Sequence, residues 1–144
     1  MKHFLWCLAL GFVVSSSAYA QTTAVNSETD PKTTPAYSML IQRKVKVQAE
    51  LETLLNQYTS EWPAAKRLRY ELDAIEAEMN TMAETMAPKI VRLTSGYGSL
   101  ILRKISLTAE LQALLQGYGS DWPEAKTRRK ELNLLEGELQ EIMK

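Results

Sequence analysis

Cysteine and histidine are almost absent from this chain of 144 residues, which has one of each. Both, Cys7 and His3, lie in the first twenty residues, MKHFLWCLALGFVVSSSAYA. The remainder therefore lacks the side chains of a disulfide framework, a thiolate zinc site, a Cys or Ser–His nucleophile and a histidine general base. The formal net charge is zero, whereas nucleic-acid-binding domains normally carry a basic excess. We expect no cofactor, no metal and no nucleic-acid partner.

A hydrophobic run of transmembrane length is also missing. The apolar segment from Phe4 to Val14 is shorter than the roughly twenty residues that a membrane-spanning helix needs. It follows a short basic start and precedes Ala18-Tyr19-Ala20, a small-residue cleavage pattern. Cys7 does not fit a lipoprotein signal, because it lies inside the apolar run. We predict a cleaved signal peptide at residues 1–20, a periplasmic or secreted location, and no stable membrane span after cleavage.

The composition changes twice after the signal. Residues 21–36 are polar, with five threonines and single Gln, Ser and Asn residues, and have almost nothing to bury, so we expect a disordered polar leader. From residue 37 the chain is dominated by Leu, Ala, Glu, Lys and Arg, the mixture typical of long helices.

An internal duplication organises the rest of the chain. Residues 37–84 align without a gap on residues 97–144, and 21 of the 48 pairs are identical at a constant offset of 60. The tetrapeptide SEWP at 60–63 recurs as SDWP at 120–123. We therefore expect two copies of one folding unit, joined by a connector at residues 85–96.

Each copy reads as two helices with a break between them. Apolar residues recur at steps of three and four on both sides of the tetrapeptide, as in the seam of a coiled coil. Pro63 and Pro123 mark helix starts, because proline is tolerated in a first turn and costly inside a helix. The serine or acid before the tryptophan is expected to cap the new helix, and Asp121 with Glu124 has the spacing of a capping box.

A short break between two amphipathic helices predicts an antiparallel hairpin. In one alignment of its helices, apolar residues face each other and opposite charges lie level in both copies. These register charges are Arg43 with Glu76, Glu50 with Arg69, Arg103 with Glu136, and Glu110 with Arg129. Lys44 and Lys104 sit on the otherwise apolar seam. Each either specifies register as a buried charge, or packs its alkyl stem while the ammonium reaches water.

The fold class that follows is all-α, with two tandem antiparallel helical hairpins resembling coiled coils. The hairpins could pack as a four-helix bundle. A seven-residue apolar step also continues across Pro88, so an elongated array with a kinked, nearly continuous helix from about residue 62 to 116 is the alternative.

The hairpin tips hold the sharpest candidates for function. In a structural interpretation each tryptophan covers the nearby tyrosine and the last leucines; in a functional one the tips present paired aromatics to a partner. Carboxylates recur at positions 71, 76 and 78 and their copies, but without an implied cleft they indicate a solvated ionic face rather than catalysis. The tip residues are Tyr58, Trp62, Pro63, Tyr118, Trp122 and Pro123.

Two stretches, LLNQYTSEWPAAKRLRYELDAIEAEM and LLQGYGSDWPEAKTRRKELNLLEGEL, resemble the periplasmic coiled-coil hairpin of polysaccharide co-polymerases, the chain-length determinants of bacterial exopolysaccharide export. The resemblance implies a similar hairpin. Trp62 and Trp122 stand where that family commonly has histidine, and we expect neither its second membrane-spanning helix nor its cytoplasmic kinase-like part. No active-site residue is implied, because this segment of the family is structural.

These features predict an exported, non-enzymatic protein that acts by association in the cell envelope, with a protein partner or with itself. No small-molecule substrate is evident. The alternative is a periplasmic chaperone-like holdase or adaptor for unfolded clients or envelope polymers, which a large exposed apolar groove would favour.

Overall fold

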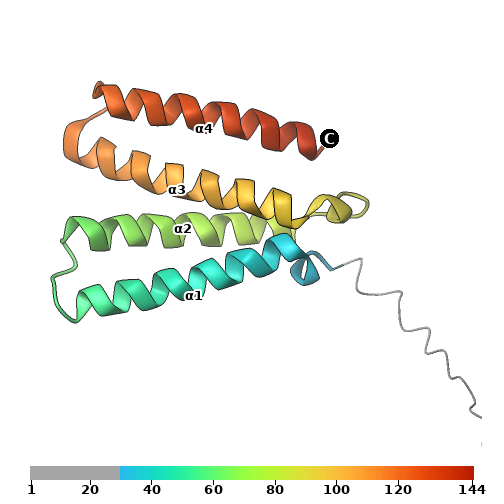
Figure 1. Cartoon of the computed structure of the whole chain (residues 1–144), viewed down its shortest axis with the longest axis horizontal. Coiled ribbons are helices and arrows are strands. Elements are labelled where there is room, and N and C mark those ends of the chain that lie inside the picture. Colours follow the sequence, from blue (N-terminus) through green and yellow to red (C-terminus); the bar gives the residue numbers. More distant parts are fainter. Residues whose placement is uncertain (1–29) are drawn as a thin grey trace, which may run out of the picture.

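Residues 30–144 are described in the computed structural model of the chain, and they consist of α-helices joined by short loops (Figure 1). The predicted all-α class is confirmed. The predicted signal peptide and residues 21–29 of the predicted leader lie outside the described residues. The elements in chain order are the 3-10 helix η1 (Pro31–Thr33), α1 (Pro35–Leu55), α2 (Pro63–Ala83), the 3-10 helix η2 (Lys89–Arg92), α3 (Ser95–Tyr118) and α4 (Pro123–Ile142).

Proline begins three of the four α-helices. Pro63 and Pro123 occupy the first turns of α2 and α4, as the sequence predicts. The predicted caps are wrong, because the residues at the cap positions are Trp62 and Trp122, and neither makes a side-chain cap hydrogen bond. The serine and the acid stand too far from the helix start once proline is its first residue.

Threonines cap the other two helices. The hydroxyl of Thr34 accepts from the backbone N–H of Tyr37 at 3.4 Å, and that of Thr94 accepts from Tyr97 at 3.2 Å. The caps lie sixty residues apart, like the copies themselves. Residues 30–36 therefore belong to the fold and not to a disordered leader, since Ala36 is fully buried and its N–H donates to the carbonyl of Leu93.

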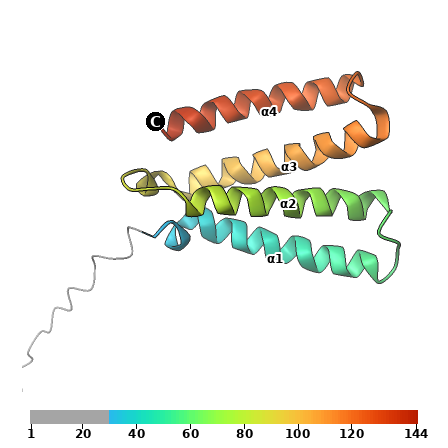
Figure 2. The same ribbon diagram turned by 180° about the vertical axis from the view of Figure 1, so that it is seen from behind.

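The chain reverses direction at each connection (Figures 1 and 2). α1 and α2 form one antiparallel hairpin and α3 and α4 form the other. α3 packs on both α1 and α2, whereas α4 packs mainly on α3 and lies at the outer edge. Both hairpin tips are at one end of the molecule, and the connector is at the other.

The connector is a turn and not a kinked helix. α2 ends at Ala83, α3 begins at Ser95, and η2 lies between them. The alternative of one nearly continuous helix is therefore wrong. The seven-residue apolar step across this region is only partly buried: Leu93 and Leu107 are almost fully buried on separate elements, whereas Met86 is exposed. An apolar side chain on a turn can enter the core just as one on a helix can.

The hydrophobic core lies where α3 meets the first hairpin. It draws residues from both copies, which explains why neither hairpin needs to be stable alone. The cluster of buried residues consists of Ala36, Leu40, Val47, Leu68, Ile75, Met82, Leu93, Ile101, Ile105 and Leu139.

Close approach of α3 to α1 depends on Gly98. A Cβ atom placed there would lie 2.9 Å from the Cα atom of Ala36 and 2.9 Å from the sulfur of Met39. Such a contact with backbone forces the helices apart, so only glycine fits this crossing. The equivalent residue of the first copy, Ser38, is exposed.

We predict that Gly98→Ala destabilises the fold by about 1–3 kcal/mol, because the clash outweighs the gain in helix propensity. Gly137→Ala in α4 is the matched control, since a Cβ atom there meets nothing within 4 Å. That variant should gain up to about 1 kcal/mol. Urea denaturation followed by circular dichroism measures both, and equal effects of the two changes would contradict the close packing of α3 on α1.

Candidate functional site at the hairpin tips

Each hairpin tip carries one stacked aromatic pair. The rings of Tyr58 and Trp62 have centroids 4.9 Å apart and planes 16° apart. Those of Tyr118 and Trp122 have centroids 4.9 Å apart and planes 20° apart. The two tips reach the same geometry from different backbones, because α1 ends at Leu55 whereas α3 continues to Tyr118 and is followed by Gly119 with φ 83°. The duplicated feature is thus the ring pair and not the loop around it.

The stacked pairs face water. Trp62 is 47% exposed and Trp122 is 44% exposed, and the two tyrosines are exposed as well. Each indole therefore covers its tyrosine, as the structural interpretation expects, while half of its own surface stays accessible to a partner. Pro63 and Pro123 follow directly and hold the backbone next to the rings.

The acid of each tetrapeptide pairs with a lysine in the first turn of the next helix. Glu61 lies 2.6 Å from Lys66, and Asp121 lies 3.3 Å from Lys126. The hydrogen bond and charge of Lys66 lower the pKa of Glu61, and the same contacts raise the pKa of Lys66. Sequence reasoning assigned the acid to capping and missed the lysine. The signal was present, because the lysine is identical in both copies.

The loop of the first tip contacts α2 and lies close to α3. Arg69 donates a hydrogen bond to the carbonyl of Ser60 at 3.4 Å, which ties the loop to α2. A cavity of about 210 Å³ separates this tip from the last turns of α3; Lys66 and Tyr70 lie on one side of it and Gln116 on the other. Near the second tip, a cavity of about 310 Å³ is lined by Glu124 at the start of α4 and by Arg67 of α2.

The register charges of α1 pair one turn away from their expected partners. Arg43 contacts Glu71 at 2.5 Å rather than Glu76. Its neighbour Lys44 takes Glu76 at 2.9 Å. Glu71 is buried, so it does not belong to the predicted solvated ionic face. A buried carboxylate requires a cation, and the long arginine reaches across to supply it.

The second copy repeats this arrangement more loosely. Arg103 lies 3.6 Å from Glu131, and Lys104 lies 3.7 Å from Glu136. Two copies with the same exchange of partners show that the exchange is a property of the hairpin.

The remaining register charges do not pair across the hairpins as expected. Glu50 contacts Lys46 on its own helix at 3.9 Å. Glu110 lies 3.0 Å from Arg128, and Arg129 makes no ion pair within residues 30–144. For Glu110 the cause is a difference between the copies. The second copy has Arg128 where the first has Leu68, and this arginine pairs with Glu110 in place of Arg129.

Lys104 links the two hairpins. Its ammonium lies 2.7 Å from Glu78 on α2 as well as near Glu136 on α4. Burial lowers the pKa of Lys104, but the hydrogen bond and charge of Glu78, with the charge of Glu136, outweigh it and raise that pKa. Burial and the charge of Glu78 raise the pKa of nearby Tyr97. The ammonium of Lys104 is thus held by carboxylates. This outcome lies between the two predicted alternatives, a buried charge and an ammonium that reaches water.

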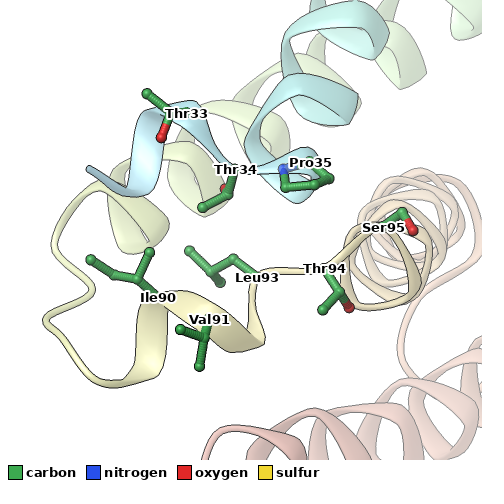
Figure 3. Close-up of a pocket in the computed structure, with 8 residues that line it drawn as sticks. All are labelled: Thr33, Thr34, Pro35, Ile90, Val91, Leu93, Thr94 and Ser95. Atoms are coloured by element: carbon green, nitrogen blue, oxygen red, sulfur yellow. The ribbon is translucent and has the colours of Figure 1, made fainter. Parts of the chain in front are cut away.

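The described residues hold no group of three or more His, Cys, Asp or Glu side chains placed to bind a metal ion. An open cavity of about 450 Å³ lies at the connector end, between η1, η2 and the start of α3 (Figure 3). Its lining is threonine, serine, proline and aliphatic side chains, none of which titrates. Within residues 30–144, no helix is both long and apolar enough to cross a bilayer.

We predict that stability falls as pH rises above about 10, where unfolded tyrosine and lysine begin to lose protons. The folded pKa values of Tyr97 and Lys104 are raised, so the folded chain holds these protons longer. Their contribution is complete below the unfolded pKa values and is lost as pH rises through the folded ones. In urea titrations between about pH 9 and 11.5, Tyr97→Phe with Lys104→Arg should reduce this loss. A loss of unchanged size in that variant would contradict the assignment.

Comparison of the chain with protein families, with curated proteins and with solved structures finds no match.

Proposed function

We propose that this chain is an exported, non-enzymatic protein that associates with a protein partner in the cell envelope through its hairpin tips. One observation carries the proposal: two stacked and half-exposed Tyr–Trp pairs lie at the same end of the molecule.

Aromatic side chains at such positions suit a binding surface. Exposed tryptophan and tyrosine dominate the energetics of protein interfaces, since each buries a large area with few rotatable bonds. Stacking and the adjacent proline restrict the rings before any partner arrives, which lowers the entropic cost of binding. The ion pairs of Glu61 and Asp121 place fixed charges beside the rings, where they would orient a partner.

Export is supported by the sequence features of residues 1–20, which match a secretory signal. The polysaccharide co-polymerase resemblance supports only a hairpin of similar design. An association role also accords with the lining of the cavity at the connector end, which offers no acid, base or nucleophile beyond hydroxyls.

A second candidate is the holdase or adaptor role. An open groove of about 570 Å³ runs between α1 and α2 near the first tip, with Ala49, Leu54 and Leu68 among its lining residues. An extended apolar segment of a client would fit such a groove. This role predicts suppression of client aggregation that does not depend on the tip aromatics.

The tip proposal predicts that Trp62→Ala with Trp122→Ala abolishes a specific contact while leaving the chain folded. Loss of each stack should cost about 0.5–1.5 kcal/mol. A photo-reactive residue at exposed Gln57, in cells that make the protein, should give one discrete cross-linked protein, and the double variant should lose it. The same residue at Asn80, on α2 nearer the connector, should give no such product.

Met86→Ala with Val91→Ala is the matched control, because it removes two exposed apolar side chains at the opposite end. It should leave the cross-link intact. Retention of the product in the tryptophan variant, or its loss in both variants, would overturn the tip proposal. Unfolding of the tryptophan variant would indicate that the rings have a purely structural role.

A further inference from the structure

The docking of α3 on the first hairpin supplies a template for a contact between copies of this chain. α3 runs parallel to α1 and antiparallel to α2, and it packs against both (Figures 1 and 2). α1 is the sixty-residue equivalent of α3, and α3 with α4 is the equivalent of the first hairpin. The second hairpin therefore has the same design as a surface that already accepts such a helix.

The outer face of α1 matches the buried face of α3. Ile101 and Ile105 are almost fully buried in the core. Their equivalents, Ile41 and Val45, are 43% and 60% exposed. Ala49 is likewise exposed where its equivalent in α3 is buried. α1 thus carries an uncovered version of the apolar face that α3 uses.

The second hairpin exposes the corresponding acceptor face. On α2, Ala74 packs against the core and Met82 is buried. Their equivalents on α4 are Leu134, which is 63% exposed, and Ile142, which is 38% exposed. Within residues 30–144, α3 is the main neighbour of α4, so this face lacks the cover that α3 gives to α2.

Side-chain sizes at the helix crossing are exchanged between the copies. Gly98 makes room for Ala36 and Met39 in the existing contact. In the equivalent contact the incoming residue would be Ser38, which is larger than glycine. The facing residues would be Gly96 and Ser99, which are smaller than Ala36 and Met39 and are both exposed. The crossing therefore avoids a steric clash with the large and small partners reversed, because the space that Ser38 takes is more than offset by Gly96 and Ser99.

The charges match as well. Lys104 contacts one carboxylate in its own hairpin, Glu136, and a second one across the hairpins, Glu78. Its equivalent Lys44 has the contact in its own hairpin, with Glu76, and no second carboxylate within the described residues. The equivalent of Glu78 is Glu138, which is exposed and unpaired in the described part of the chain. A docked copy would bring Lys44 to Glu138.

We propose that the outer face of α1 in one copy docks on α3 and α4 of a second copy, with Lys44 of the first beside Glu138 of the second. The contact is head-to-tail, so each copy still offers its other face and the assembly can grow beyond a dimer. This proposal is independent of the tip-mediated function, because it uses residues from the opposite edges of the molecule and none from the tips.

The contact should be dissociable. Two positions on the α1 face are more polar than their equivalents in α3: Gln42 replaces Leu102 and Thr53 replaces Ala113. A single-helix contact with reduced apolar area is small for a stable interface. We expect a dissociation constant on the order of 1–100 µM.

Sedimentation velocity of the purified full chain tests the proposal. The weight-average mass should rise with concentration across that range. Glu138→Lys should raise the dissociation constant at least about tenfold, because two ammonium groups then meet. Lys44→Glu should do the same, and an equal mixture of the two variants should associate again, because each supplies the charge that the other requires.

Asp73→Lys is the matched control, because it makes the same charge change at an exposed position on α2 outside both faces. It should associate like the parent chain. Lys44→Glu also removes an ion pair inside the hairpin, so Leu134→Gln serves as a second variant if the first fails to fold. Leu134→Gln should weaken association at least about threefold.

Carbodiimide cross-linking of an equal mixture of isotope-labelled and unlabelled chain identifies the contact. The expected product joins Lys44 to Glu138 with one labelled and one unlabelled peptide. A chain that stays monomeric, association that Glu138→Lys leaves unchanged, or cross-links from residues before Asp30 to α4 of the same chain would each overturn the proposal. Loss of tip-mediated binding alone would not affect it.

Discussion

The seating of α3 against both helices of the first hairpin is the contact on which the rest of the fold depends. A hairpin of this length buries too little apolar surface to be stable alone, and α3 supplies the third side of the core. The same contact makes two copies of similar sequence unequal. α3 covers one face of the first hairpin. In the second hairpin, α3 packs on the first hairpin and on α4, and α4 packs mainly on α3. Residues such as Ile41 and Ile101, identical in type, consequently have very different exposure.

The ion pairs between helices determine the helix register more than they contribute to the stability of the fold. Glu71 is buried against Arg43, and Lys104 is held between carboxylates of α2 and α4. Desolvation offsets most of the attraction within a buried pair, so its net contribution to stability is small. Removal of one partner, however, leaves an uncompensated charge, and alternative alignments of the helices are therefore disfavoured. For this protein, the hypothesis is that the pairs select one register and one position of α3.

Sequence reasoning found the duplication, the hairpins and the helix starts, because each depends on local signals: a constant offset, apolar periodicity and the conformational restriction of proline. It was incomplete or wrong where distant residues decide. The sequence left open whether the predicted connector at 85–96 is a turn or a kinked helix, because an apolar step continues through Leu93. The predicted partner of Arg43 was wrong, because a long side chain can reach several carboxylates. The tip residues were identified, but the stacking of Tyr58 on Trp62 rather than over leucines depends on a loop path that no local pattern specifies.

The parallel course of α1 and α3 sends both tips to one end of the molecule. Under the proposed function, a partner with one binding site can occupy only one tip at a time, so the second tip only doubles the number of places where it can bind. A partner that repeats its site, such as a symmetric oligomer, meets the second tip at a high effective concentration, because the first contact has already brought it near. Modest affinity at each tip then suffices for firm retention. The duplication would in this way select for the valency of a partner as well as for its chemistry.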